Sequence, residues 1–453
     1  MIHSFTCLGK YYILNANTLS LAECDRLTHT ILPDYLKGGS ISALGYTSQE
    51  INEAKADLDE LKSSGFFNAK DWSGAIVSHG GEIKAMCLHA AHDCNLRCRY
   101  CFADTGEYNG PRGLMPAETG KLALDFLIDN SGSRKNLEVD FFGGEPMMNL
   151  PAVKEIVEYG RELEKKHDKV FKFTITTNGM NLKEDMLPYL NAEFDNIVIS
   201  VDGRQQTHDN MRPCPNGAGS FEKILPAAKM LADSRHQQQY YVRGTFTAHN
   251  LDFSDDVLFL ADQGFEQVSI EPVVAAYEVD YAITEQHIET IFDEYEKLAR
   301  EYLKRRADGR WFNFFHFMLD LDDGPCVSKR LSGCGAGSEY IAVAPDGSIY
   351  PCHQFVGNGE YLMGNVHNAT FNRAMQARFG ENTVLTKEEC SDCWCKFFCS
   401  GGCAANSLNF AGDISKAYEL GCSLQKKRME CALAIWAEEK QAEQEPHIDY
   451  AAQ

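Results

Sequence analysis

The stretch CLHAAHDCNLRCRYCF, residues 87–102, holds three cysteines at the spacing Cys94-x-x-x-Cys98-x-x-Cys101. Three thiolates in one short loop can hold three irons of a [4Fe-4S] cluster and leave the fourth iron open to a small molecule, whereas clusters that only carry electrons usually have four cysteine ligands. The loop therefore predicts a cluster that takes part in chemistry. The alternative from the same residues is three cysteines that are simply packed or joined by disulfides.

The composition narrows the class of protein. A length of 453 residues exceeds what one core usually serves, so we expect two or three domains. A net charge of -22, with no compensating basic stripe, argues against nucleic acid as a partner. The N-terminus lacks the basic start of a secretion signal and no apolar run reaches the length of a membrane span, so we expect a cytoplasmic protein with no membrane partner. In that reducing compartment, 17 cysteines favour metal ligands over disulfides.

Strand-like and helical patterns alternate from about residue 84 to 275. The strand candidates are 85–90, 137–142, 171–177, 196–201, 240–247 and 267–273, and helical periodicity falls at 116–130, 151–166, 183–190, 220–233 and 254–264. Alternation of this kind implies parallel pairing, and six units predict a partial α/β barrel with its site at the carboxyl ends of the strands. The three-cysteine loop follows the first of these strands.

Residues 1–80 predict a separate small α+β module. A strand is expected at 11–14, a helix at 20–31 behind a serine cap at Ser20, and an amphipathic helix from Thr47 with Ser48 near its cap. Two interpretations remain open for this module. It either packs on the rest of the chain as a decoration, or it is a docking domain whose exposed strand edge accepts a leader peptide by β-addition.

The sequence CNLRCRYCF (94–102), followed by Gly-Gly-Glu-Pro at 143–146, resembles radical S-adenosylmethionine (radical SAM) enzymes. TTNG at 176–179, SVDG at 200–203, HDNMRP at 208–213 and GSF at 219–221 extend the resemblance. It implies a partial (β/α)6 barrel at 84–310, in which a reduced cluster held by Cys94, Cys98 and Cys101 cleaves SAM to methionine and a 5′-deoxyadenosyl radical. The residues implied to bind SAM are Tyr100, Gly143, Gly144, Glu145, Pro146, Thr176, Asn178, Ser200, Asp202 and Arg212.

The later cysteines resemble the SPASM extension, which carries two auxiliary [4Fe-4S] clusters and would occupy 311–453. This implies three clusters in all. The implied ligands are Cys334, Cys352 and Cys403 for the first auxiliary cluster and Cys390, Cys393, Cys399 and Cys422 for the second. Zinc is the alternative, because Cys-x-x-Cys pairs bind it well. Cys326 either completes the first auxiliary cluster or leaves it an open iron that could bind a substrate cysteine, which would give Cys326 a catalytic role.

One departure bears on the subclass. Sulfatase maturases carry an Asp directly after the cysteine matching Cys352, whereas this chain has His353. Together with Cys326 and the N-terminal module, a winged-helix-like peptide-recognition domain, this most resembles maturases of six-Cys-in-forty-five (SCIFF) peptides, which form thioether cross-links. The implied partners are a cysteine-rich precursor peptide, whose leader the N-terminal domain would bind, and an electron donor such as flavodoxin or ferredoxin.

Other functions remain open from the sequence. One is another SPASM enzyme, such as a sulfatase maturase that makes formylglycine, and another is a non-enzymatic ferredoxin-like or zinc-binding scaffold. Glu271, Arg243 and His353 lie at predicted strand ends or beside a ligand and could contact substrate, although charged residues at such ends are often scaffold or surface.

Overall fold

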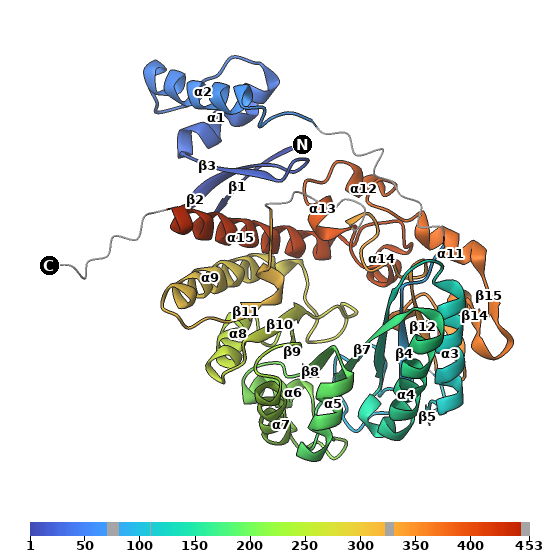
Figure 1. Cartoon of the computed structure of the whole chain (residues 1–453). Coiled ribbons are helices and arrows are strands. Elements are labelled where there is room, and N and C mark those ends of the chain that lie inside the picture. The colour runs from blue at the N-terminus through green and yellow to red at the C-terminus, as the bar shows by residue number, and fades with distance from the viewer. Residues whose placement is uncertain (70–80, 109, 322–329, 445–453) are drawn as a thin grey trace.

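A computed structural model describes residues 1–69, 81–108, 110–321 and 330–444 (Figure 1). Its strands form a three-stranded sheet near the N-terminus and a 12-stranded mixed sheet in the rest of the chain. Among the residues described, no helix is both long and apolar enough to cross a membrane.

The N-terminal module is an antiparallel sheet covered by two helices. Its strands are β1 (Ile2–Cys7), β2 (Lys10–Asn15) and β3 (Ser20–Cys24), and its helices are α1 (Arg26–Lys37) and α2 (Ser48–Ser63). One face of the sheet packs on α1 and α2 through a core that includes Ile13, Ile31 and Leu58. The opposite face packs Phe5 and Tyr12 into the main core.

One sequence expectation for this module is wrong in detail. Residues 20–24 form strand β3 and not the start of a helix, because they pair with β2 in register from Ser20 to Cys24. The helix begins at Arg26, capped by the Asp25 side chain, which accepts the Thr28 N–H at 2.6 Å. Helix α2 lies where it was expected: Ser48 is its first residue, and Thr47 is its cap and forms a reciprocal capping box with Glu50.

The predicted alternation of strands and helices between residues 84 and 275 forms a parallel sheet. Its strands are β4 (Ala85–His92), β6 (Asn136–Gly143), β7 (Val170–Thr177), β8 (Asn196–Ser200), β9 (Tyr240–Phe246), β10 (Gln267–Pro272) and β11 (Asn313–Phe314), paired in that order. The first six match the six strand candidates to within two residues at each end. The short β5 (Gly113–Leu114) pairs antiparallel with the end of β4.

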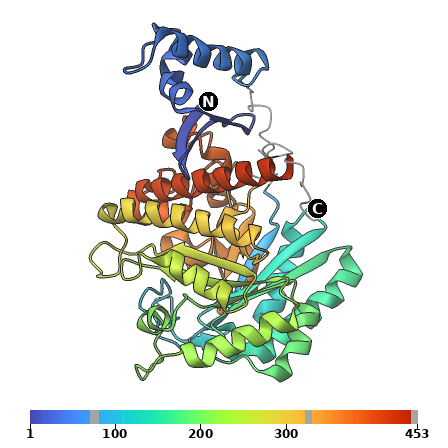
Figure 2. The same ribbon diagram turned by 90° about the vertical axis from the view of Figure 1, so that its left-hand side faces the viewer.

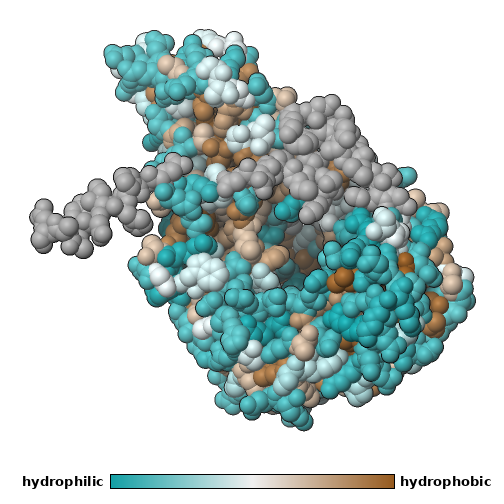
Figure 3. All heavy atoms as spheres, in the orientation of Figure 1, coloured by the Kyte–Doolittle hydropathy of each residue, from teal (hydrophilic) through white to brown (hydrophobic). Residues whose placement is uncertain are grey.

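Helices follow the strands and cover the outer side of the sheet (Figures 1 and 2). They are α3 (Ala117–Asn130), α4 (Leu150–His167), α5 (Leu187–Glu193), α6 (Gln205–Met211), α7 (Phe221–Ser234), α8 (Phe253–Asp262) and α9 (Ile288–Ala307). Helix α4 shows why they dock: Val153, Ile156, Val157 and Leu163 recur at helical spacing and are buried. The surface over these helices is mostly hydrophilic (Figure 3).

The C-terminal region extends the same sheet. Strand β12 (Tyr340–Val343) pairs in parallel with β4, and β13 (Ser348–Tyr350), β14 (Gly364–Asn365) and β15 (Thr370–Phe371) follow antiparallel. The remaining helices are α11 (Arg373–Gly380), α12 (Glu388–Ser391), α13 (Lys396–Cys399), α14 (Ala404–Ala411) and α15 (Glu419–Gln444). Helix α15 lies along α9 and beneath the N-terminal sheet (Figures 1 and 2). The bounds of the three domains stay a prediction.

Candidate active site

The three-cysteine loop lies where the barrel was expected to place its chemistry. Cys94, Cys98 and Cys101 follow β4 and line a cavity of about 290 Å³ at the carboxyl ends of the parallel strands. Ser200 and Thr245, at the ends of β8 and β9, line the same cavity. The parallel direction of the strands brings these ends together, because each strand finishes at the same edge of the sheet.

The surroundings of the three sulfurs suit thiolate ligands. The Leu96 N–H points at Cys94 Sγ from 3.4 Å, and Asn178 Nδ2 lies 3.6 Å from the same sulfur. Burial raises the pKa of Cys94 to about 12 and that of Cys98 to about 11, while the charge of Arg212 opposes the rise at Cys98. Donors aimed at sulfur are the kind of interaction that tunes bound iron–sulfur clusters. The donor set therefore fits the predicted cluster.

The Gly-Gly-Glu-Pro turn is held against this loop by its backbone. Gly144 N–H donates to Ala91 O at 2.7 Å, and Glu145 N–H donates to Asp93 O at 2.9 Å. A Cβ on Gly143, whose φ is +118°, would lie 2.3 Å from Ala91 O, and one on Gly144 would lie 2.1 Å from Asp93 O. Only glycine allows the two backbones to approach so closely.

Glu145 organises the turn from behind. Its carboxylate is 1% exposed and accepts the Thr177 hydroxyl at 2.7 Å and the N–H groups of Asn178 and Met147 at 2.7 and 2.9 Å. Burial raises the pKa of Glu145 to about 7, and these three donors oppose the rise. Glu145 thus fastens the turn after β6 to the turn after β7.

A second buried carboxylate holds the adjoining wall. The Tyr100 hydroxyl donates to both Asp202 oxygens, at 2.9 and 2.7 Å, and Arg212 Nε donates to Asp202 Oδ1 at 3.0 Å. The Arg212 guanidinium lies 5.3 Å from the centre of the Tyr100 ring. Asp202 thereby fixes two of the side chains implied to bind SAM.

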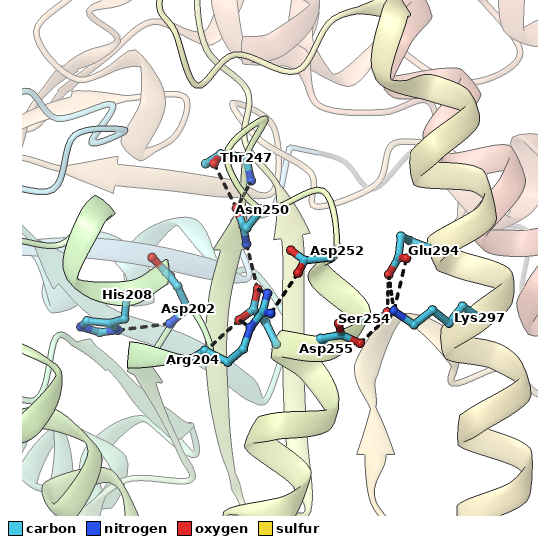
Figure 4. A network of polar contacts seen from close by, with 11 residues as sticks. Asp202, Arg204, His208, Thr247, Asn250, Asp252, Ser254, Asp255, Glu294 and Lys297 are labelled. Atoms are coloured by element: carbon cyan, nitrogen blue, oxygen red, sulfur yellow. Dashed lines mark hydrogen bonds and ion pairs between the residues drawn. The ribbon is translucent and has the colours of Figure 1, made fainter. Parts of the chain in front are cut away.

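The turn after β8 is anchored to helix α8 by a polar network (Figure 4). The Arg204 N–H and side chain both donate to Asp256 Oδ1, at 2.9 and 2.8 Å, and Asn250 donates to Asp256 Oδ2 at 3.0 Å. Arg204 also pairs with Asp252 at 2.9 Å. These contacts keep the turn that carries Asp202 in place.

His208 closes this network from the other side, and it yields a pH prediction. Its Nδ1 accepts the Asp202 N–H at 3.3 Å, and its Nε2 lies 3.0 Å from Ser220 Oγ. Burial, aided by the charge of Arg212, lowers the pKa of His208 to about 3. Because the unfolded chain binds this proton below about pH 6.5 and the folded chain does not, stability falls as the pH drops from 6.5 toward 3.

Between about pH 7 and pH 5, we expect the free energy of unfolding of His208→Asn to fall by about 2 kcal/mol less than that of the wild type. Urea unfolding of the reduced apoprotein at both pH values measures it. His236→Asn, at an exposed position, is the matched control and should keep the slope of the wild type. An unchanged slope in His208→Asn would contradict a neutral buried histidine.

The structure separates the residues implied to bind SAM into two groups. Seven line the cavity: Tyr100, Gly143, Gly144, Thr176, Asn178, Ser200 and Arg212. The other three do not line the cavity and are buried: Glu145, Pro146 and Asp202. The carboxylates of Glu145 and Asp202 already accept the hydrogen bonds described above. The contacts of all ten with SAM stay a prediction.

The other predicted ligands gather into two further groups. Cys352 is buried, and burial raises its pKa, with Cys403 and Cys334 lying close enough to add to the rise. Cys422 is surrounded by Cys399, Cys390 and Cys393, and burial raises its pKa to about 11. The cysteines thus neighbour one another in the division that the resemblance implies, and their roles as cluster ligands stay a prediction. Cys326 lies outside the described residues.

The environment of these sulfurs carries one buried cation. Lys387 is 3% exposed, donates to Gly401 O at 3.0 Å and lies near cysteines of both groups.

Among the described residues, no three His, Cys, Asp or Glu side chains are grouped tightly enough to hold a single metal ion.

Sequence reasoning missed several residues of the site. His89 and His92 lie 3.0 Å apart through their ring nitrogens, and His92 stacks on Tyr108, which lines the cavity. His353, which the sequence did single out as a possible substrate contact, lines the same cavity beside Phe102 and Phe142, whose ring centres lie 5.4 and 5.2 Å from its own. The HAAH spacing at the end of β4 was the available signal, since it places both histidines beside the loop.

A second cavity adjoins the first. It has a volume of about 250 Å³ and is bordered by Cys399, Cys403 and Cys422. Glu271 and Pro272 at the end of β10, Val273 and Val274 after it, and Asn406 line both cavities. The cavity of the three-cysteine loop and the cavity of the later cysteines therefore share a wall that includes Glu271.

Comparison with known proteins agrees with this arrangement. Residues 90–245 match the model of the radical SAM superfamily, and residues 334–394 match that of SPASM, an iron–sulfur cluster-binding domain. The chain therefore contains a radical SAM domain and a SPASM domain, which are of kinds that use SAM and iron–sulfur clusters.

Similar proteins span most of the chain. A cysteine-type anaerobic sulfatase-maturating enzyme of Clostridium novyi (strain NT) is 25% identical over 70% of this chain and 86% of that enzyme. The antilisterial bacteriocin subtilosin biosynthesis protein AlbA of Bacillus subtilis (strain 168) is 25% identical over 74% of this chain and 71% of AlbA. The crystal structure of Streptococcus suis SuiB bound to precursor peptide SuiA has a TM-score of 0.52 at 15% identity and covers 92% of this chain and 97% of that one.

Proposed function

We propose that this chain is a radical SAM enzyme that forms a cysteine thioether cross-link within a ribosomally made, cysteine-rich precursor peptide. The observation that carries the proposal is that the cavity of the three-cysteine loop adjoins a second cavity bordered by later cysteines, with Glu271 to Val274 and Asn406 lining both. A peptide that occupied both cavities would have a carbon near the SAM site and a cysteine sulfur near Cys403, the member of the first auxiliary group that lines the second cavity. A peptide substrate is also supported by SuiB, which was solved with a precursor peptide.

The three groups of cysteines would hold the clusters that supply the redox chemistry. When bound, three clusters and SAM would provide a hydrogen-abstracting radical and take up the electron left over after carbon–sulfur bond formation. In the cross-link, one carbon–sulfur bond would replace one carbon–hydrogen and one sulfur–hydrogen bond: the carbon would give its hydrogen atom to the radical derived from SAM, the sulfur would lose its proton to solvent, and one electron would remain for the bound clusters to accept. The chain's own part is to hold the peptide carbon within reach of SAM, since positioning supplies much of the rate.

The N-terminal module suits capture of a leader peptide. None of the five residues of β3 is buried, and among the described residues β3 pairs only with β2, which leaves one edge for an added strand. The sheet is anchored to the rest of the molecule, since His3 bonds Glu430 of α15 at 3.0 Å and stacks on Trp394 at 4.0 Å. A docked leader would thus have a fixed path to the cavity. Flavodoxin or ferredoxin is the proposed electron donor.

A sulfatase maturase is the second candidate, favoured by the relative from Clostridium novyi. His353 weighs against it, because this position offers an imidazole where those enzymes have a carboxylate. Burial, with the charge of Arg243, lowers the pKa of His353 to about 4.

The experiment is anaerobic incubation of the reconstituted chain with SAM, a reductant and a six-cysteine peptide. We expect mass spectrometry to show the loss of one hydrogen pair per cross-link and one alkylatable thiol fewer each time. An aldehyde that reacts with a hydrazide would instead establish formylglycine formation. An unmodified peptide alongside released 5′-deoxyadenosine would rule out this substrate class.

A further inference from the structure

An ion pair stands at the junction of the two cavities. Glu271, near the end of β10, lines both of them, and Arg243 of β9 donates to its Oε2 from 2.8 Å. Both side chains remain part-exposed to the cavities, at 48% for Arg243 and 38% for Glu271. We call these two residues the neck pair. A peptide that reached from one cavity to the other would pass beside Glu271, which lines both, and its partner Arg243, which lines the first.

A chain of polar contacts supports the neck pair from helix α15. His316 is 6% exposed, and its Nε2 lies 3.9 Å from Glu271 Oε1 and 3.2 Å from Ser269 Oγ. Arg428 of α15 lies 2.9 Å from His316 Nδ1 and itself lines the second cavity. Because an arginine only donates, Nδ1 must be the acceptor and the neutral ring carries its proton on Nε2, facing Ser269 and Glu271.

The charges of these groups are well defined. Although burial opposes it, the positive charge of Arg243 lowers the pKa of Glu271 to about 2, so Glu271 is an anion. Burial, with the charge of Arg428, lowers the pKa of His316 to about 3, so the ring is neutral at physiological pH. The neck pair is thus balanced in charge and presents a strong donor beside a strong acceptor.

This combination matches a neutral ligand with a donor and an acceptor of its own. An extended peptide segment offers N–H and C=O groups along its length, whereas a free anion or cation would meet the wrong half of the pair. Pro272, Val273 and Val274 supply an apolar wall next to it. The neck therefore has the composition of a specific peptide subsite, apolar with a few placed polar groups.

We propose that Glu271 and Arg243 bind main-chain amide groups of the substrate peptide at the neck, and that Arg428, acting through His316, positions Glu271 for this contact. The inference rests on the proposed function. Arg243 and Glu271 are substrate-binding residues in it, and Arg428 and His316 are positioning residues. It also explains why a residue of α15, the helix beneath the N-terminal sheet, reaches into the cavity.

The test uses the full reconstituted chain, SAM, a reductant and the six-cysteine peptide. For Glu271→Ala we expect the KM for the peptide to rise about tenfold. The amount of 5′-deoxyadenosine released per cross-link should also rise, because a misplaced peptide wastes turnovers. Glu271→Gln, which keeps the shape and one acceptor, should show a smaller rise.

The positioning role is tested at Arg428. Arg428→Met should raise the peptide KM with a smaller change in kcat, and Arg428→Lys should restore most of the affinity because it keeps a donor. Asp195→Asn is the matched control, since it breaks the 2.7 Å Lys172–Asp195 ion pair, which lies at the amino-terminal ends of β7 and β8. Iron content and circular dichroism verify that each variant is folded and loaded.

The outcomes separate the two proposals. A wild-type chain that does not modify the peptide removes the proposed function. If the wild type forms cross-links but Glu271→Ala and Glu271→Gln keep its peptide KM and its product ratio, the neck inference is wrong. A rise in the Kd for SAM equal to the rise in peptide KM would also overturn it, because the pair would then serve SAM.

Discussion

Replacing Cys98 with alanine is expected to abolish release of 5′-deoxyadenosine, with a fall of more than about a hundredfold. Cys98 is one of three thiols at the cavity, so its loss would leave two ligands for the cluster. Changes in outer-shell partners of a metal site already lower affinity or activity about 10–100-fold, and loss of a ligand should do more. We also expect the iron content to fall by about four atoms per chain.

The matched control for this prediction is Cys214→Ala. Cys214 lies in a turn near the same loop, where Pro213 O accepts the Arg97 N–H at 2.8 Å, but it belongs to none of the three groups. This variant should keep its iron and its SAM cleavage. Chromatography of the nucleoside product and chemical iron analysis measure both quantities. Undiminished 5′-deoxyadenosine from Cys98→Ala would refute the assignment of the loop.

The second large effect is expected for Gly144→Ala, which should weaken SAM binding about thirtyfold. The new Cβ would lie 2.1 Å from Asp93 O, a backbone atom next to Cys94 that cannot swing aside like a side chain. The turn and the cysteine loop would have to separate, at on the order of 2 kcal/mol for a crowded site. Equilibrium dialysis with labelled SAM measures the change.

Gly113→Ala is the matched control for this substitution, since nothing lies within 4 Å of a Cβ at Gly113. It should bind SAM as the wild type does. Thermal melts of both variants distinguish a local effect from unfolding. Equal SAM affinity in Gly144→Ala and the wild type would mean that the close approach of the two backbones is not needed for binding.

Much of the barrel could be predicted because its signals are local. Alternation of apolar runs with helical periodicity located six strands, and the position of the cysteine triplet after the first one located the cavity. The helix expected at 20–31 was wrong at its start, where residues 20–24 fit both a helical and a strand pattern. Ser20 to Cys24 have helical spacing, but pairing with β2 decides their conformation, and such pairing depends on residues distant in sequence.

The sequence by itself determined which residues are candidates for the chemistry: the cysteine triplet, the glycine turn that follows β6 and the later cysteines. The reason is that the spacing of cysteines within one short loop decides which sulfur atoms can reach the same metal cluster. Only the tertiary structure decided what those residues do for one another. It placed Glu145 and Asp202 behind the wall as supports, and it joined Arg428 through His316 to Glu271 at the neck. The most distant of these contacts joins residues 112 positions apart in the sequence, and no local pattern encodes such packing.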